Sequence, residues 1–282
     1  MNCIKKYHLF ISAHLDDAIL SCGDYIDWLI QRGTKVTVAT VFTGMGTELS
    51  MLARIIHKKF GLGLNTMDVR RLEDMQAANM LGTNVLHLGQ LESIYRKNKD
   101  GSPIYNKLQD LFITEGGEEA EVMEEIVTAM MNQINFRNYD RIYLPLGIGR
   151  HIDHFLVREA AEQCMVRSAP LTNSRLYYYE DLPYLCYNQD KQWKSELASG
   201  LSPISIMLSR TNLRAKINAS LQYNSQLSLL WTSRYSMLKQ MVGHAKSIHS
   251  VGQSVQVDSG AYVFRVYSTS NEKSVSLSSP VM

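Results

Sequence analysis

The chain has 282 residues, of which 45% are hydrophobic and 20% are charged. These values are ordinary for a globular protein, and a chain of this length buries a sizeable core without disulfide or metal staples. The 29 basic and 27 acidic residues give a formal net charge of +2, which provides no reason to expect nucleic-acid or membrane binding.

The cysteines and the N-terminus favour a cytoplasmic protein. Cys3, Cys22, Cys164 and Cys186 are widely spaced and form no CxxC pair, so we expect reduced thiols in a reducing compartment. The first apolar run is broken at His14 and is too short for a signal peptide or a membrane span. We find no other stretch long enough to cross a bilayer.

Strand and helix patterns alternate along the first part of the chain. In order, they predict a strand at 7–13, a helix from 17 to 32, a strand at 35–43, a loop from 44, a helix over 69–81, a strand at 84–88, an irregular stretch over 90–117, a helix over 122–134, a strand at 141–144, a helix over 154–166 and a strand at 176–179. Such alternation predicts an α/β fold with a Rossmann-like, mostly parallel sheet flanked by helices.

The pattern changes beyond about residue 183. Residues 213–235 look helical, and residues 255–267 resemble one or two strands. The Ser-rich tail over 268–282 is expected to be mobile. Because no linker divides the chain, we expect a single domain over 1–282 with a C-terminal helix and strand elaboration.

A first candidate motif, AHLDD, follows the first predicted strand. Ligands of open α/β sheets bind where strands run into loops. His14 followed three residues later by Asp17 can place two metal-binding side chains on one side of the turn. The alternative is that Asp16 or Asp17 caps the next helix. The motif alone leaves both interpretations open.

A second candidate motif, HIDH, follows the fourth predicted strand. His151, Asp153 and His154 come after a turn that contains Gly147 and Gly149. Two histidines and a carboxylate in four residues are typical of hydrolytic sites, although a surface cluster could arise by chance. Because parallel strands end at one edge of the sheet, the fold would bring the two motifs together.

The combined motifs predict a metal-dependent hydrolase. His14, Asp17 and His154 would bind Zn²⁺ and leave a position open for water, whose pKa zinc lowers toward ~7. The same ligands could also accept Fe²⁺ or Co²⁺.

The other polar residues would supply proton transfer and charge stabilisation. Asp16 would take the proton of the attacking water as general base. His151, if protonated, would stabilise the oxyanion or protonate the leaving amine. Asp153 would orient His151 and favour its charged form.

AHLDD at 13–17 and HIDH at 151–154 resemble the motifs AHPDD and HPDH of the PIG-L (LmbE-like) N-acetylglucosaminyl deacetylases. The similarity extends over most of residues 7–230. It includes RRLE at 70–73, YR at 95–96, YEDLPY at 179–184, Lys216 and SQ at 225–226. The resemblance implies one zinc ion and hydrolysis of an N-acetyl group on an amino-sugar-containing small molecule.

The family also implies roles for individual residues. It assigns the ligand, base and helper positions to the residues named above, and it places Arg70 at a position that contacts substrate. Arg96 is a second substrate-binding candidate. The alternatives are a solvated helix-face arginine for Arg70 and a surface salt bridge of little energetic worth for Arg96.

Two positions depart from the family pattern. Leu15 stands where proline is usual, which we expect to change the stiffness of the loop. Ala18 stands where glutamate is usual. We expect Ala18 to alter contacts at the start of the helix without removing metal binding, and it weakens the transfer of substrate identity.

Three rival functions stay open. A nucleotide-binding oxidoreductase would share the fold, but the turn HLDDAILSCG lacks a glycine-rich phosphate cradle. The others are a non-catalytic metal-binding scaffold and a zinc enzyme that cleaves another amide or N-acyl conjugate. The expected partner is a small acetylated amino sugar, with no nucleic acid and no membrane span, and a homo-oligomer is compatible with the sequence.

Overall fold

The computed structural model describes residues 6–112, 119–168, 175–186, 191–251 and 261–269. The strands are β1 (Tyr7–Ser12), β2 (Lys35–Gly44), β3 (Asn84–Leu91), β4 (Arg141–Pro145), β5 (Arg175–Tyr179), β6 (Ser202–Ser209) and β7 (Ala261–Ser268). The α-helices are α1 (Asp17–Gln31), α2 (Met51–Phe60), α3 (Thr66–Leu81), α4 (Ala120–Gln133), α5 (Ile152–Ser168), α6 (Lys191–Leu197), α7 (Arg210–Ser220), α8 (Asn224–Leu230) and α9 (Arg234–Val251). Short 3₁₀ turns lie at Ser93–Tyr95, Leu108–Leu111, Phe136–Asn138 and Tyr184–Cys186.

In the described part of the chain the strands form one sheet with the order β3-β2-β1-β4-β5-β7-β6. Strands β1 to β5 pair in parallel, and β7 is antiparallel to both β5 and β6. The order reverses beside β1, because the chain runs outward through β2 and β3 and returns on the other side as β4. The carboxyl ends of β1 and β4 therefore flank the switch point at which open α/β sheets bind ligands.

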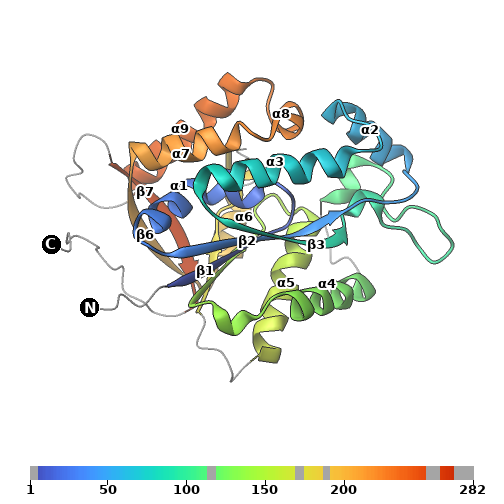
Figure 1. Cartoon of the computed structure of the whole chain (residues 1–282), viewed down its shortest axis with the longest axis horizontal. Helices are drawn as coiled ribbons and strands as arrows, with labels where there is room; N and C mark the ends of the chain where they lie inside the picture. Colours follow the sequence, from blue (N-terminus) through green and yellow to red (C-terminus); the bar gives the residue numbers. More distant parts are fainter. Residues whose placement is uncertain (1–5, 113–118, 169–174, 187–190, 252–260, 270–282) are drawn as a thin grey trace.

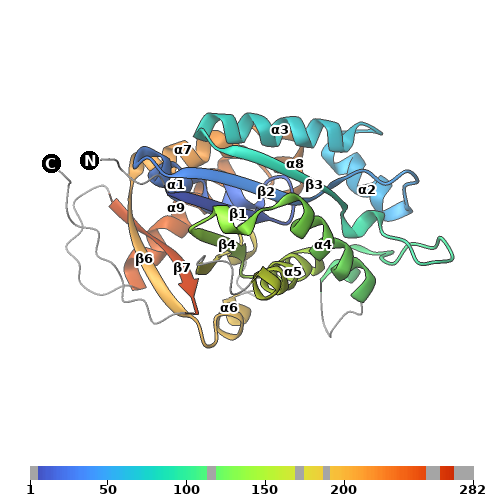
Figure 2. The ribbon, with the colours of Figure 1, turned by 60° about the horizontal axis from the view of Figure 1, so that its bottom comes forward.

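Helices cover both faces of this sheet. Helices α1, α3, α7 and α9 lie on one face, and α4 and α5 lie on the other, as Figures 1 and 2 show. Successive residues of β1 face opposite sides, so Phe10 packs with the first helix group and Leu9 and Ile11 pack with the second. The predicted α/β class with a mostly parallel sheet is confirmed.

Helix α2 lies where the sequence predicted a loop. Leu52, Ile56 and Phe60 recur every four residues and bury one face of the helix. They pack on Leu15 and Leu111, which come from distant parts of the chain. The apolar stripe of α2 is short and lies among basic residues, so the local sequence pattern is weak. Contacts with the rest of the chain therefore stabilise the helix.

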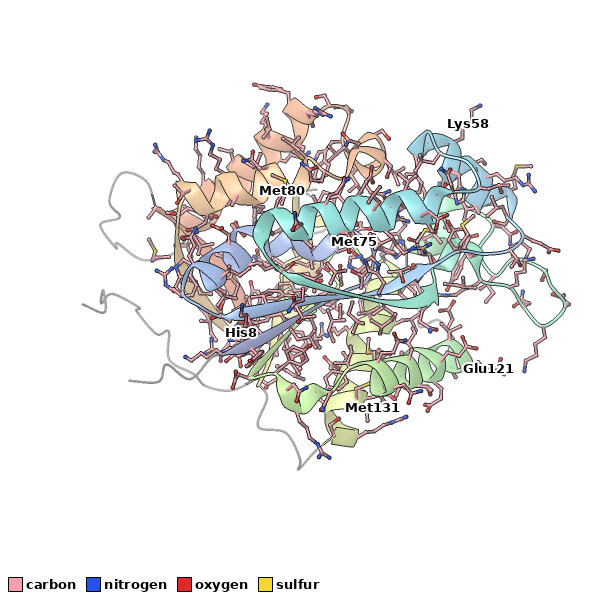
Figure 3. The ribbon with its side chains drawn as sticks, viewed as in Figure 1. His8, Lys58, Met75, Met80, Glu121 and Met131 are labelled. Carbon is pink, nitrogen blue, oxygen red and sulfur yellow. The ribbon has the colours of Figure 1, made fainter. Side chains whose placement is uncertain are left out.

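The helix expected over 69–81 forms as α3, but its buried face is not the expected apolar one. Leu72 is 51% exposed and Met75, labelled in Figure 3, is 48% exposed. Arg70, Glu73 and Asp74 are buried instead. Charged residues are rarely buried without partners. Each of these three side chains forms a hydrogen bond with another buried residue.

The C-terminal part differs from the prediction in two ways. The single helix expected over 213–235 is wrong, because α7 and α8 are separated at residues 221–223 and α9 begins at Arg234. Strand β6 was not expected. Of the residues predicted as strands over 255–267, those from 261 onward form β7. Residues 255–260, residues 113–117 of the expected irregular stretch and the tail from 270 lie outside the described residues.

Among the residues that the structure describes, no helix combines the length and the apolar character needed to cross a bilayer.

A buried lysine links the C-terminal elements to the first helix. Lys216 of α7 donates to the Ser21 carbonyl oxygen at 2.8 Å, and its Nζ lies 3.5 Å from Asp24 Oδ2. Tyr262 of β7 also donates to that carboxylate, at 2.7 Å. The buried carboxylate of Asp24 on α1 thus has polar partners from both α7 and β7.

Lys216→Met should lower the free energy of unfolding by about 3–5 kcal/mol, because it leaves the Asp24 carboxylate buried without its cation. Urea denaturation followed by circular dichroism measures this change. The matched control is Lys58→Met on the exposed side of α2 (Figure 3), where the change should stay within about 0.5 kcal/mol. Equal midpoints for the two variants would contradict the proposed stabilising role of the buried pair.

Candidate metal centre and active site

The loops after β1 and β4 bring the two motifs into contact. His14 Nε2 lies 2.9 Å from Asp153 Oδ2, although the residues are 139 positions apart in the chain. His154 Nε2 lies 3.3 Å from Asp17 Oδ2. The switch point of the sheet therefore carries a cluster of imidazoles and carboxylates.

Neither aspartate of the first motif caps helix α1. Asp16 occupies the N-cap position, but its side chain makes no capping hydrogen bond. Ser12 Oγ instead accepts from the backbone amide of Ala18 at 3.1 Å. Asp17 Oδ2 accepts from the His14 amide at 2.7 Å and so stiffens the turn. The capping interpretation of the motif is wrong.

His14, Asp17 and His154 form a group that fits a metal ion. Each offers one ligand atom, and these atoms lie within 4.8 Å of one another. His154 Nε2 is buried without a hydrogen-bond partner, which costs free energy unless another group satisfies it. Two imidazole nitrogens and one carboxylate oxygen match the ligands of hydrolytic zinc sites.

A second group shares His14 with His151 and Asp153. Both oxygens of the Asp153 carboxylate already accept hydrogen bonds. Oδ2 accepts from the Ser93 amide at 3.1 Å and from the Ser93 hydroxyl at 2.9 Å, and Oδ1 accepts from Arg96 at 2.6 Å. The first group is therefore the better candidate. Asp153 Oδ2 lies 4.0 Å from His151 Nδ1, so its closest histidine contact is His14 and not His151 as expected.

Asp181, just after β5, was not among the predicted site residues. Its Oδ1 lies 2.8 Å from His154 Nδ1, and its Oδ2 accepts from the amides of Gly147 and Ile148 at 2.8 and 2.9 Å. One carboxylate thus orients a candidate ligand and the glycine turn that precedes it. The similarity of the segment YEDLPY to the family was the only available signal.

The glycine turn depends on close packing. Gly147 and Gly149 have φ values of 89° and 91°, in the region that favours glycine. A Cβ on Gly149 would lie 2.4 Å from the ring of Tyr184. The turn can therefore bring His151 to the cleft, and His154 to its contact with Asp17, only with glycine at this position.

The buried carboxylates control the charge of the two candidate histidine ligands. Burial alone would lower the pKa of both imidazoles, but Asp17 outweighs it, together with Asp153 at His14 and Asp181 at His154. The pKa of His14 lies well above its usual value, and that of His154 rises to about 10. The cluster consequently favours positive charge, as a cation site must.

Asp16 and Asp17 differ in their acidity. Burial and the neighbouring Asp17 charge raise the pKa of Asp16 to about 7, against the opposing effect of Arg70. Burial would also raise the pKa of Asp17, but His154 and His14 hold it well below its usual value. One carboxyl is therefore suited to proton exchange and the other to binding a cation.

His151 is held neutral. Burial lowers its pKa to about 3, because the attraction of Asp153 does not compensate for it. The backbone amide of Asp153 donates to His151 Nδ1 at 3.2 Å, so the ring proton resides on Nε2. The charged form expected from the sequence is not favoured in this arrangement.

Several of these residues line a cleft of about 330 Å³. Its polar lining includes His14, Asp16, Asp17, His151 and Asp153. Its apolar lining includes Ile56, Phe60, Leu111, Phe112, Leu229 and Leu230. The cleft therefore has room for a small organic molecule that presents one polar group to the histidine cluster.

Arg70 lines this cleft and is only 2% exposed. Its guanidinium donates to Glu92 and lies 5.1 Å from the ring of Phe60. The alternative of a solvated helix-face arginine is wrong.

Arg96 is also buried, but it belongs to a different environment. The Arg96 guanidinium donates hydrogen bonds to the Leu91 carbonyl oxygen at 3.2 Å, to Glu119 at 2.7 Å and to Asp153 at 2.6 Å. Arg96 lines a neighbouring cavity of about 770 Å³, where paired surface charges prevail, and not the cleft. The alternative of a surface salt bridge is wrong, and the described contacts favour a positioning function over substrate binding.

A family model described as "PIG-L: GlcNAc-PI de-N-acetylase" matches residues 9–165 of the chain. The chain belongs to the PIG-L family. Two similar curated relatives are 2'-N-acetylparomamine deacetylases. The one from Niallia circulans is 32% identical over 199 residues, which cover 65% of this chain and 70% of the relative. The one from Streptomyces fradiae is 25% identical over 226 residues, which cover 77% and 72%. The expected family is confirmed.

Solved structures resemble most of the chain. A teicoplanin deacetylase in its zinc-inhibited form is 27% identical with a TM-score of 0.74, and the match covers 95% of this chain and 100% of that one. A 4-carboxy-2-hydroxymuconate hydratase from Pseudomonas putida shares the fold at 16% identity and a TM-score of 0.54, over 92% and 95% of the two chains. Because so distant a likeness shows the fold alone, the reaction must be argued from the site.

The two departures from the PIG-L pattern are both buried. Leu15 is fully buried and joins the apolar cluster that supports α2 beside the cleft. Ala18 is buried in the first turn of α1, and nothing in the structure explains the change from glutamate. His14, Asp16, Asp17, His151, Asp153 and His154 are all present despite these changes.

Asp181→Asn should weaken Zn²⁺ binding by about 10- to 100-fold, because an amide cannot accept from His154 and both turn amides at once. Competition with a chromogenic chelator measures the dissociation constant. Asp68→Asn on the exposed side of α3 is the matched control and should bind Zn²⁺ like the wild type. An unchanged constant for Asp181→Asn would rule out its role in orienting His154.

Proposed function

We propose that this protein is a metal-dependent N-deacetylase that hydrolyses the acetamido group of a small amino-sugar compound. The observation that carries the proposal is the group of His14, Asp17 and His154, with an unsatisfied His154 nitrogen, beside Asp16 in a cleft at the switch point. Family membership and the deacetylase activity named for relatives support the same reaction class.

We propose zinc as the metal and these three residues as its ligands. When bound, zinc acts as a Lewis acid that makes water acidic enough to lose a proton near neutral pH and polarises an amide carbonyl. The similar teicoplanin deacetylase was solved in a zinc-inhibited form, so zinc can also inhibit a relative. Fe²⁺ and Co²⁺ consequently belong in any reconstitution experiment.

Asp16 is the proposed general base. Its carboxylate lines the cleft and makes no hydrogen bond to any other described residue. It can therefore take the proton of the attacking water and return it to the nitrogen of the leaving amine. The negative charge of Asp17 next to it raises the pKa of Asp16 and so favours uptake of the proton, which is passed to the nitrogen as the C–N bond breaks.

His151 is the proposed electrophilic helper in its neutral form. With Nδ1 accepting from the Asp153 amide, the Nε2 proton remains to donate to the carbonyl oxygen as negative charge develops there. Asp153 positions His14 through the 2.9 Å contact, and Arg96 and Ser93 position Asp153 in turn. Arg70 is the proposed donor to the sugar.

The substrate class is proposed from relatives. Two of them are named for the deacetylation of 2'-N-acetylparomamine, an amino sugar compound, and structural neighbours are named for teicoplanin deacetylation. Cleavage of a different amide remains the alternative that a panel of N-acyl substrates separates. An oxidoreductase is disfavoured, because Asp16 and Asp17 would repel a pyrophosphate at the first turn.

We also propose that the chain forms one domain. Strands β6 and β7 extend the same sheet as the PIG-L strands, and α7 packs against α1 and α3. The C-terminal elements therefore share a core with the rest of the chain.

The central test compares His154→Ala and Asp16→Asn with the wild type. We expect His154→Ala to lose both bound metal and acetate release, since it removes a ligand. Asp16→Asn should retain metal but lose about 10²–10⁴ in kcat, since it removes only the base. Elemental analysis and acetate release from N-acetylated amino sugars measure the two properties. Metal binding by His154→Ala, or full activity of Asp16→Asn, would overturn the assignment.

A second test separates Arg96 from Arg70. Arg96→Lys should lower kcat by about tenfold or more with KM near the wild-type value, because it disturbs Asp153 and not the substrate. Arg70→Lys should raise KM by about tenfold, because it removes donors from the cleft. Steady-state kinetics decide between the roles. A rise in KM for Arg96→Lys would restore it as a substrate-binding residue.

A further inference from the structure

Helix α8 places a buried glutamine on the wall of the cleft. Gln226 is 3% exposed and lines the same cavity as Asp16 and Arg70. It lies in the C-terminal part of the chain, beyond the residues 9–165 that match the family model. Gln226 belongs to the SQ segment that resembles the family, but it lies outside the matched range and the sequence assigned it no role.

The orientation of the Gln226 amide follows from its neighbours. Glu73 of α3 accepts from the Ser225 backbone amide at 2.9 Å and from the Ser225 hydroxyl at 2.6 Å. A carboxylate only accepts, so the hydroxyl proton of Ser225 is committed to Glu73. The same hydroxyl oxygen then accepts from Gln226 Nε2 at 2.8 Å. The amide nitrogen is thereby directed at Ser225.

This arrangement leaves the amide oxygen of Gln226 as a fixed acceptor at the cleft. No described residue donates to Oε1. Gln226 Oε1 is not one of the fully buried atoms that lack a partner among the described residues, so it is accessible from the cleft, and a ligand or water there can donate to it. The burial of the side chain and the contact with Ser225 restrict its rotation, so little conformational entropy is lost when a donor binds.

We propose that Gln226 is a specificity-determining residue whose Oε1 accepts a hydrogen bond from a hydroxyl or ammonium group of the substrate. Arg70 supplies donors and Gln226 supplies the acceptor, a combination that suits a ring bearing several hydroxyl or amino groups. Phe60 and Leu229 provide apolar surface for the carbon face of such a ring. The inference rests on the proposed function and narrows its substrate class to amino sugars that have a free donor beside the acetamido group.

The test uses Gln226→Leu, which removes the acceptor, and Gln226→Glu, which keeps the shape and adds a negative charge. The probes are N-acetylglucosamine, an N-acetylated aminoglycoside with free amines, and N-acetylcyclohexylamine, which has the ring without hydroxyls. Metal content of each variant must equal that of the wild type. Gln222→Leu, which lies on the turn before α8 and outside the cleft, is the matched control.

Gln226→Leu should lower kcat/KM by about 3- to 10-fold on the substrate with hydroxyl donors and by about 10- to 100-fold on the one with ammonium donors. It should leave the cyclohexyl probe unchanged. Gln226→Glu should raise kcat/KM for the aminoglycoside if an ammonium is the donor, and should do so only for that probe. A hydroxyl donor predicts no gain with Gln226→Glu on any probe.

Equal kcat/KM for Gln226→Leu and wild type on both sugars would overturn the proposal, as would an equal loss on the cyclohexyl probe. Calorimetric binding of the deacetylated aminoglycoside to each variant provides a second readout that needs no turnover. If the wild type releases no acetate from any probe, the proposed reaction fails. A weaker affinity of Gln226→Leu for the aminoglycoside would still support the binding role of Gln226, and equal affinities would contradict it.

Discussion

Burial of acidic side chains at the ends of three neighbouring strands is the constraint on which the rest of the structure depends. Asp17, Asp153 and Asp181 follow β1, β4 and β5, and all three are buried. An unpaired carboxylate in such a position costs several kcal/mol. Each one is therefore paired with imidazole, guanidinium or backbone amides, and these partners determine the conformation of the loops.

The pairing links the cluster to distant parts of the fold. Glu119 at the start of α4 contacts Arg96, which contacts Asp153, which contacts His14. The candidate ligand is thus linked to a helix on one face of the sheet. Asp181 provides a comparable link for His154 from β5. Such outer contacts keep candidate ligand atoms in place, and Arg70 and Arg96, which are similarly buried, make different contacts.

The C-terminal elements contribute more than additional strands. The family model matches residues 9–165, which contain His14, Asp17 and His154. Asp181 and Gln226 lie beyond that range. Residues of the matched part can therefore perform the proposed chemistry, while the later elements orient one ligand and shape the wall that a substrate meets. This division is consistent with similar proteins that are named for different compounds.

The sequence by itself determined the fold class and the two motifs that meet at the switch point. It could do so because strand and helix periods are local, and because parallel strands end at one edge of a sheet. It also supported His14, Asp17 and His154 as candidate ligands through residue type and spacing. Helix α2 and the inward charged face of α3 were missed, since both depend on partners far away in the chain.

Only the tertiary structure decided which carboxylate contacts which histidine. Asp153 is two residues from His151 in the chain, yet it contacts His14 across 139 positions, and Asp181 was recognised only when β5 lay beside β4. The contacts of Arg96, the neutral form of His151 and the direction of the Gln226 amide also follow from the tertiary structure. Hydrogen bonds and burial depend on distances between elements, and one-dimensional spacing does not contain those distances.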